Sequence, residues 1–220
     1  MHGSTVARTL DTGTFRGELR RQRWDDHRLY HHSRINQSLH LFSALSFLTA
    51  YVMLLVVPTI APIVGWMLAM SSRQVGHFFF EPKGYDDVNG LSHESKEDMK
   101  VGYNLRRKVV LMTLWALTPF ALLIDPSLLG LLEPHTGTSD YLANLSAVWL
   151  ALGLAGLLFR TIQLFFISNV RTGLVWCTKI LTDPFHDLKL YCKAPLYLLR
   201  GELIDPMHEV GPAGRRLSGT

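Results

Sequence analysis

The stretch that decides the fold is "LHLFSALSFLTAYVMLLVV", residues 39–57, which is predominantly apolar. A helix of about 20 apolar residues is long enough to cross the hydrocarbon core of a bilayer. "PTIAP" (58–62) follows at once, and its two prolines break the helix in a tight turn. A second apolar run, "IVGWMLAM" (63–70), comes next. The sequence therefore predicts a helical hairpin that enters a membrane.

Two further apolar runs lie at residues 109–124 and 141–166. Charged residues make up only 18% of the 220 residues, below the roughly 25% of a soluble domain, and the mean hydropathy is +0.15. We therefore expect an all-α integral membrane bundle of about four transmembrane helices. The wholly apolar part of the second segment (63–70) is short, so a re-entrant segment is the alternative there.

The basic residues alternate along the chain. Residues 1–38, 81–108 and 160–220 hold all but one of the 22 lysines and arginines, whereas 58–62 and 125–141 hold none. Positive charge marks the cytoplasmic ends of membrane helices, so both termini are expected in the cytoplasm. These charges border apolar segments and indicate topology rather than a nucleic-acid surface. With no organelle signal evident, we expect a bacterial inner membrane.

Three regions follow from this pattern. Residues 1–24 are expected to form a disordered cytoplasmic terminus, because they carry little hydrophobic periodicity. Residues 25–167 form the four-helix membrane domain, whose first helix begins near Asp25 and Asp26 and runs without a break into the first span. Residues 168–220 mix apolar and basic side chains and predict interfacial helices. The two cysteines form no CxxC pair, which predicts reduced thiols.

Polar side chains concentrate at the entry to the first span, in "YHHSRINQSLHLF" (30–42). His32, Asn36 and His40 are four residues apart, so on one continuous helix they share a face. His31 diverges from its neighbour by about 100° on such a helix and is expected to point elsewhere. The pattern predicts that His32 and His40 act together.

Other histidines are expected at the same depth. The hairpin is antiparallel, so His77 returns to the cytoplasmic level of His40, and His93 begins the next helix. Glu81 follows His77, and Glu97 follows His93, by four residues, which places each pair on one helix face. Imidazole and carboxylate ligands together suit iron or zinc. A metal site at the cytoplasmic edge of the bundle is thus one hypothesis.

Each of these residues also has an ordinary explanation. A histidine at a membrane interface is often simply solvated, and His77 can be a hydrogen-bonded histidine between helices. His93 can be a first-turn residue of its helix. Arg73 can form a salt bridge with a carboxylate such as Glu81 or bind the carboxylate of a lipid, and we favour the salt bridge.

Two stretches together resemble a known family. "YHHSRINQSLH" (30–40) and "RQVGHFFFE" (73–81) are similar to the paired signatures of the 2-hydroxy fatty acid dioxygenases of fatty-acid α-oxidation, known from the fungal endoplasmic reticulum and from bacteria. The resemblance covers roughly residues 25–90. The chain departs from the family after Glu81, where "PKGYDDVNG" replaces a short Pro-Ala stretch, and residues after about 125 have no counterpart. The matching positions are His32, Asn36, His40, Gln74, Gly76, His77 and Glu81.

The resemblance implies an Fe(II)-dependent membrane enzyme. It would use O2 to convert a 2-hydroxy fatty acid, or a related lipid, into an acid one carbon shorter, the substrate carboxylate and hydroxyl chelating the iron. The implied metal ligands are His32, His40 and His77, with His93 as a further candidate. Asn36 and Glu81 would orient the imidazoles, and Arg73 or Gln74 would contact the carboxylate.

Two other functions are compatible with the sequence. "HRLYHH" (27–32) superficially resembles a motif of membrane di-iron hydroxylases and desaturases, but those enzymes need repeated histidine clusters that do not follow here. A non-catalytic membrane subunit is the alternative from another class. Its histidines would be structural or bind zinc, and it would pack against a second copy or a larger membrane complex.

Overall fold

The computed structural model describes residues 13–81, 84–86, 89–99 and 105–207. Within these ranges the regular structure is helical, with two isolated bridges and no strand, which confirms the all-α prediction. The helices, in chain order, are α1 (Phe15–Tyr30), α2 (Arg34–Val56), α3 (Ala61–Val64), the π-helix η2 (Gly65–Met70), α4 (Ser71–Phe79), α5 (His93–Met99), α6 (Leu105–Ile124), α7 (Thr138–Ile167), α8 (Val170–Tyr191) and α9 (Ala194–Leu199).

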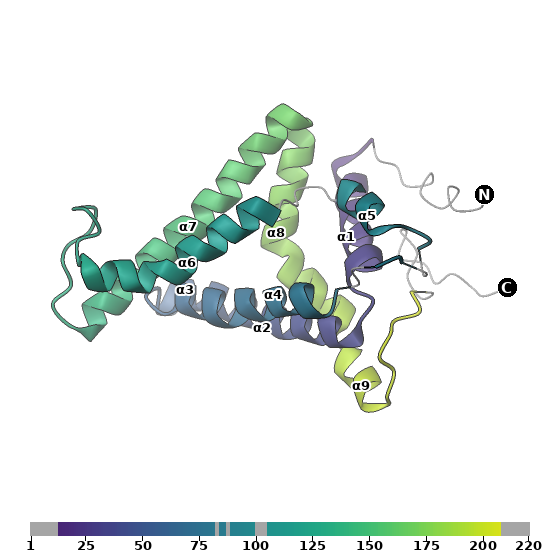
Figure 1. Cartoon of the computed structure of the whole chain (residues 1–220), viewed down its shortest axis with the longest axis horizontal. Helices are drawn as coiled ribbons and strands as arrows, with labels where there is room; N and C mark the ends of the chain where they lie inside the picture. Colours follow the sequence, from purple (N-terminus) through teal and green to yellow (C-terminus); the bar gives the residue numbers. More distant parts are fainter. Residues whose placement is uncertain (1–12, 82–83, 87–88, 100–104, 208–220) are drawn as a thin grey trace.

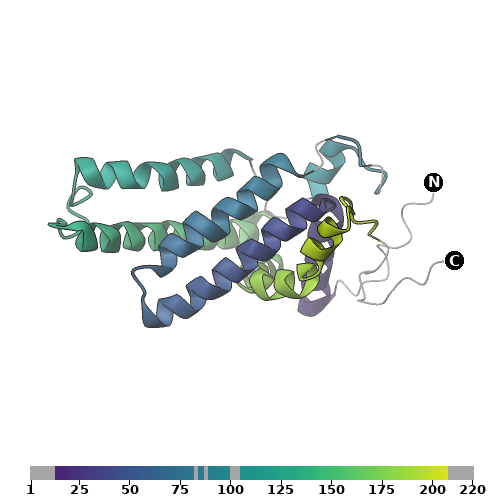
Figure 2. The same cartoon turned by 90° about the horizontal axis from the view of Figure 1, so that it is seen from below.

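The helices form two antiparallel pairs joined by α8. One pair is α2 with the segment α3–η2–α4, and the other is α6 with α7 (Figure 1). From the end of α7, α8 returns across the molecule and packs against α2, α7 and α1. Figure 2 shows the turn after α2 and the α6–α7 loop at one end of the bundle, and α1, α5 and α9 at the other. The predicted hairpin is therefore present.

Among the described residues, two helices, α2 and α7, are long and apolar enough to cross a membrane. The described apolar part of α6, Lys108–Ile124, is shorter, and the return arm of the hairpin is divided among three short helices. Length and composition thus agree with membrane association, and the arrangement of four spans is not confirmed.

A tryptophan cluster joins the two helix pairs. Trp66 of η2, Trp115 of α6 and Trp149 of α7 stack in sequence, with ring centroids 5.8 and 5.7 Å apart. The indole N–H of Trp66 donates to the Trp149 carbonyl at 2.8 Å, and that of Trp149 donates to the Trp115 carbonyl at 3.1 Å. A buried indole needs such an acceptor, so these contacts fix the relative positions of the three helices.

The first helix differs from the prediction at both ends. It begins at Phe15 rather than near Asp25, because the Thr14 side chain accepts a hydrogen bond from the backbone N–H of Gly17 at 3.1 Å and caps it. It ends at Tyr30, so the expectation of one unbroken helix into the first span is wrong. The remainder of the expected N-terminal disorder, residues 1–12, and the last part of the C-terminal segment, residues 208–220, lie outside the described residues.

The break between α1 and α2 is stabilised by polar contacts. The carbonyl groups of residues 30–32 accept, in order, from the side-chain amide of Asn36 at 2.9 Å, that of Gln37 at 2.8 Å and the backbone N–H of Asp205 at 2.7 Å. Ser33 then caps α2 by accepting from the backbone N–H of Asn36 at 3.4 Å. A buried carbonyl needs a partner, so these contacts make the break a defined part of the fold.

The α2–α4 contact depends on a glycine. A Cβ atom added to Gly76 would overlap Oδ1 of Asn36 and lie 3.3 Å from its Cγ and 3.5 Å from Cδ2 of His40. Asn36 and His40 are fully buried and cannot withdraw into solvent. The absent side chain of Gly76 therefore allows α4 to approach the polar face of α2.

We predict that Gly76→Ala destabilises the protein by about 1–3 kcal/mol, because it overpacks this contact. Thermal unfolding of the purified protein in detergent measures the effect. Gly153→Ala is the matched control, since its Cβ would meet only Cζ2 of Trp66 at 4.0 Å and alanine favours a helix. Equal melting temperatures for the two variants would contradict the proposed packing.

Candidate metal centre

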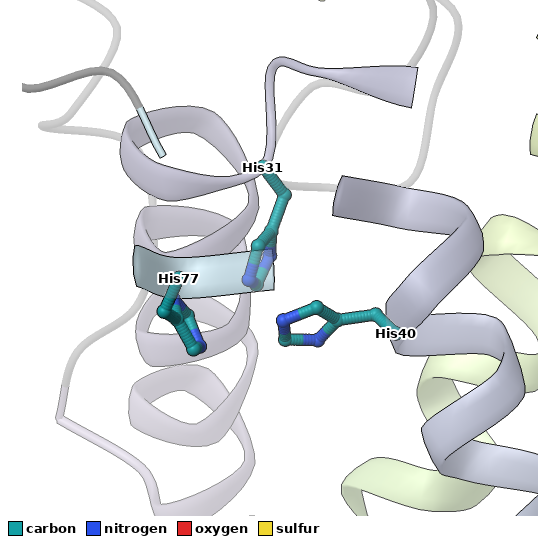
Figure 3. Close-up of side chains that lie close together, drawn as sticks. All are labelled: His31, His40 and His77. Carbon is teal, nitrogen blue, oxygen red and sulfur yellow. The ribbon is translucent and has the colours of Figure 1, made fainter. Parts of the chain in front are cut away.

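Three histidines meet at the polar end of the α2–α4 hairpin. One nitrogen from each of His31, His40 and His77 lies within 4.8 Å of the others (Figure 3). The ring centroids are 4.1 Å apart for His31 and His40, 4.9 Å for His40 and His77, and 5.4 Å for His31 and His77. The rings come from three elements, the end of α1, the first part of α2 and α4. This cluster can hold a metal ion.

Unpaired ring nitrogens support that conclusion. Both nitrogens of His40 and Nε2 of His31 are buried and have no hydrogen-bond partner. His40 is fully buried and His31 is 4% exposed. Buried polar atoms of this kind cost free energy unless a partner, such as a bound ion, satisfies them. The donor set therefore fits a metal ion that takes imidazole ligands, such as iron or zinc.

Each imidazole also faces a protein group on its Nδ1 side. Nδ1 of His77 is hydrogen-bonded to Oε2 of Glu81 at 2.7 Å, and Nδ1 of His31 to the hydroxyl of Tyr191 at 2.8 Å. Nδ1 of His40 lies 3.6 Å from Oδ2 of Asp187, close but beyond hydrogen-bond length. In all three rings Nε2 is the nitrogen left for the centre of the cluster.

Burial keeps the histidines around Tyr191 neutral. Desolvation, followed by repulsion from His40, holds the pKa of His31 well below its usual range. Burial likewise lowers the pKa of His27, whose Nδ1 lies 3.2 Å from the Tyr191 hydroxyl, to about 4, although Asp205 raises it. A metal ligand must be neutral imidazole, so His31 is in the protonation state that a metal requires at pH 7.

The prediction that His31 points away from the site is wrong. It rested on a continuous helix, but the chain leaves helical geometry at His31 (φ −115°, ψ 41°), which directs this ring toward His40. His32 lies apart from the cluster, and its Nε2 contacts the Arg28 carbonyl and lies 3.2 Å from Nδ2 of Asn89. The structure does not bring His32 to the other two predicted ligands.

The remaining predicted residues divide between the cluster and its surroundings. Glu81 contacts His77 as its four-residue spacing predicts. His93 is exposed at the start of α5 and is not part of the cluster. Asn36 supports the chain break through the Tyr30 carbonyl rather than contacting a ring nitrogen. Nε2 of Gln74 is 3.1 Å from Sδ of Met70, and its Oε1 is buried without a partner.

Arg73 forms the salt bridge that the sequence favoured, but with other carboxylates than Glu81. Its Nη1 lies 3.1 Å from Oδ2 of Asp187, and its Nη2 lies 3.9 Å from Oδ2 of Asp183. Both aspartates belong to α8. The same oxygen of Asp187 therefore faces Arg73 on one side and His40 on the other.

Sequence reasoning missed Asp187 and Tyr191. They belong to "DPFHDLKLY" (183–191), in the segment expected to be interfacial. Asp183, Asp187 and Tyr191 recur every four residues, which is the one signal that they share a helix face. Nothing local indicates that this face meets the histidines.

An apolar cavity of about 380 Å³ lies between α2, η2, α7 and α8. Arg73, Gln74 and Asp183 contribute its charged and amide side chains, whereas most of the lining is aliphatic or aromatic. The residues that α2 contributes run from Phe47 to Leu54, about 10 to 21 Å along the helix from His40. The cavity thus extends from the Arg73 end toward the turn after α2.

No family model, curated protein or solved structure matches the chain. The geometry of the histidine cluster and of the apolar cavity is therefore the basis for assigning a function.

The adjacent histidines of the chain break provide the first test of the centre. We predict that His31→Ala weakens binding of Fe(II) or Co(II) by more than about 100-fold, because it removes a ligand rather than an outer partner. His32→Ala should keep near-wild-type affinity, since His32 lies outside the cluster. Anaerobic metal titration of the purified variants measures both. The reverse ranking would contradict the assignment of His31.

Proposed function

We propose that this protein is a membrane-bound, metal-dependent dioxygenase that shortens a 2-hydroxy fatty acid, or a related lipid, by one carbon. The observation that carries the proposal is the cluster of His31, His40 and His77, in which Nε2 of His31 and both nitrogens of His40 are buried without partners. Two of these residues, with Glu81, also belong to the motifs that resemble the 2-hydroxy fatty acid dioxygenases.

Fe(II) is the proposed metal, because zinc has no redox chemistry and would fit only the non-catalytic alternative. His31, His40 and His77 would hold the ion, and iron would supply the one-electron chemistry that O2 requires. Within the chain, Glu81 and Tyr191 hold the rings of His77 and His31 in place. Burial excludes bulk water from His31 and His40, whereas His77 is partly exposed.

The cavity supports a lipid substrate. An acyl chain matches its apolar lining, and the head group then lies beside Arg73 and Gln74 at the end near His40. The guanidinium of Arg73 would bind the substrate carboxylate, and the unpaired Oε1 of Gln74 would accept a hydrogen bond from the 2-hydroxyl group. Both residues would thereby hold the reacting carbons next to the histidines.

The proposed reaction balances without an external reductant. A 2-hydroxy acid and one O2 give the acid one carbon shorter, carbon dioxide and water. The bond between C1 and C2 breaks, and O2 accepts the four electrons that the substrate loses. The chain needs no second redox cofactor for this stoichiometry.

We further propose that the two helix pairs insert together as four spans, with both termini in the cytoplasm of a bacterium. The charged helices α1 and α5 lie with the short helix α9 at one end of the bundle. Both α1 and α5 belong to the basic segments 1–38 and 81–108 of the sequence, which favours a cytoplasmic position for that end. The site would then open at the cytoplasmic interface, where the head group of a long-chain acid resides while its tail remains in lipid.

We predict that detergent-purified protein loaded with Fe(II) consumes O2 in the presence of 2-hydroxypalmitate and forms the 15-carbon acid. His77→Ala should abolish both while leaving the helical circular-dichroism spectrum unchanged. Oxygen uptake and mass spectrometry of the fatty acids measure the outcome. Bound iron with no turnover of any 2-hydroxy acid would contradict the activity, and stable zinc with a co-purifying partner would favour the non-catalytic alternative.

The length of the acyl chain provides a second test. Leu54 lines the cavity at its far end, so Leu54→Trp should lower turnover of the longest substrates and spare shorter ones. Leu55→Trp is the matched control, because Leu55 is 87% exposed and does not line the cavity. Competition between 2-hydroxy acids of different lengths measures the shift. An identical length profile in the two variants would contradict the proposed position of the chain.

A further inference from the structure

One face of α8 lies against the histidine cluster. Asp187 and Tyr191, one turn apart, are 4% and 2% exposed. Oδ2 of Asp187 lies 3.6 Å from Nδ1 of His40, and the hydroxyl of Tyr191 lies 2.8 Å from Nδ1 of His31. Both residues belong to the part of the chain that has no counterpart in the family resemblance.

The identity of the contacted nitrogen matters. A neutral imidazole carries one N–H and one lone pair, and only the nitrogen with the lone pair binds a metal. When Nδ1–H donates to a protein oxygen, the lone pair is on Nε2. Glu81 imposes this arrangement on His77 from its own segment, whereas His40 and His31 depend on α8.

We propose that Asp187 and Tyr191 are positioning residues that select the metal-binding tautomers of His40 and His31. This inference rests on the proposed metal centre. Neither residue touches the ion. Each takes the Nδ1–H of one imidazole and thereby turns its Nε2 lone pair toward the centre of the cluster.

The hydroxyl of Tyr191 fits this role because it has partners on both sides. Nδ1 of His31 and Nδ1 of His27 lie 2.8 and 3.2 Å from its oxygen. If Nδ1–H of His31 donates to this oxygen, the single hydroxyl proton remains available for Nδ1 of His27. When His31 binds a metal through Nε2, the two hydrogen bonds of Tyr191 are therefore compatible, with the proton donated from His31 to Tyr191 and from Tyr191 to His27.

The carboxylate of Asp187 has a second function. The oxygen that faces His40 also pairs with Arg73 at 3.1 Å, and Arg73 lines the apolar cavity. A movement of roughly half an ångström would bring the His40 contact to hydrogen-bond length. One carboxylate thus lies between a proposed metal ligand, His40, and a cation that lines the apolar cavity, Arg73.

The test is the affinity of the full-length, detergent-purified protein for Co(II), followed by its visible absorption. We expect Tyr191→Phe and Asp187→Asn each to weaken Co(II) binding about 10- to 100-fold, the usual effect of removing an outer partner of a ligating histidine. Both substitutions preserve side-chain size. The Co(II) spectrum should also change, because the orientation of one imidazole is released.

Asp183→Asn separates a positioning role from a structural one. Asp183 lies on the same face and contacts Arg73, but it also pairs with Lys179 at 3.0 Å and Arg23 at 3.2 Å. This variant should lose at least as much thermal stability as Asp187→Asn and yet retain wild-type Co(II) affinity. Asp183→Asn would then bind Co(II) more tightly than Asp187→Asn without being the more stable of the two variants.

Three results would overturn the inference. If Tyr191→Phe and Asp187→Asn bind Co(II) as the wild type does, these residues do not position ligands, and the proposed metal centre stands without them. If Asp183→Asn weakens binding equally, the effect of α8 is structural. If the wild type binds no Co(II) or Fe(II), the metal centre itself is wrong, and the inference fails with it.

Discussion

The set of hydrogen bonds that closes the break between α1 and α2 is the constraint on which the rest of the site depends. Three consecutive carbonyl groups, of residues 30–32, are satisfied by Asn36, Gln37 and the backbone of Asp205. These partners stabilise the break, since a buried carbonyl without a hydrogen bond is costly. The break directs His31, instead of His32, toward His40. It also ties the C-terminal segment to the start of α2.

Several charged side chains within this apolar bundle pair with more than one partner. Arg73 is paired with Asp187 and Asp183. Lys179 is paired with Asp183 and Asp26. Oδ2 of Asp187 also lies 3.6 Å from Nδ1 of His40. Breaking a buried pair by removing one partner is strongly destabilising, so these charges hold α4 and α8 in register. Both ring nitrogens of His40 and Nε2 of His31, by contrast, are buried without partners and lie in one cluster. Their proximity to one another and to His77 distinguishes a candidate binding site from the ion pairs around it.

The features of the structure that can be predicted from the sequence are local ones. The apolar runs and the two prolines predict the α2–α4 hairpin, and its antiparallel course brings His40 and His77 together. The four-residue spacing predicts the contact between His77 and Glu81. The sequence predicted His32 instead of His31 as a metal ligand. That prediction was wrong because the break between α1 and α2 depends in part on Asp205, which is far away in the chain. Asp187 and Tyr191 could not be predicted, since only the return of α8 across the bundle brings them to the cluster.

The central claim is that His31, His40 and His77 together bind one metal ion through imidazole nitrogen. X-ray absorption spectroscopy of the wild-type protein loaded anaerobically with Fe(II), with a Co(II)-loaded sample as a second probe, measures the ligands directly. The account predicts a light-atom shell with the multiple-scattering pattern of three imidazoles and no sulfur. A spectrum with one imidazole or none, or one dominated by carboxylate or water oxygen, would contradict it.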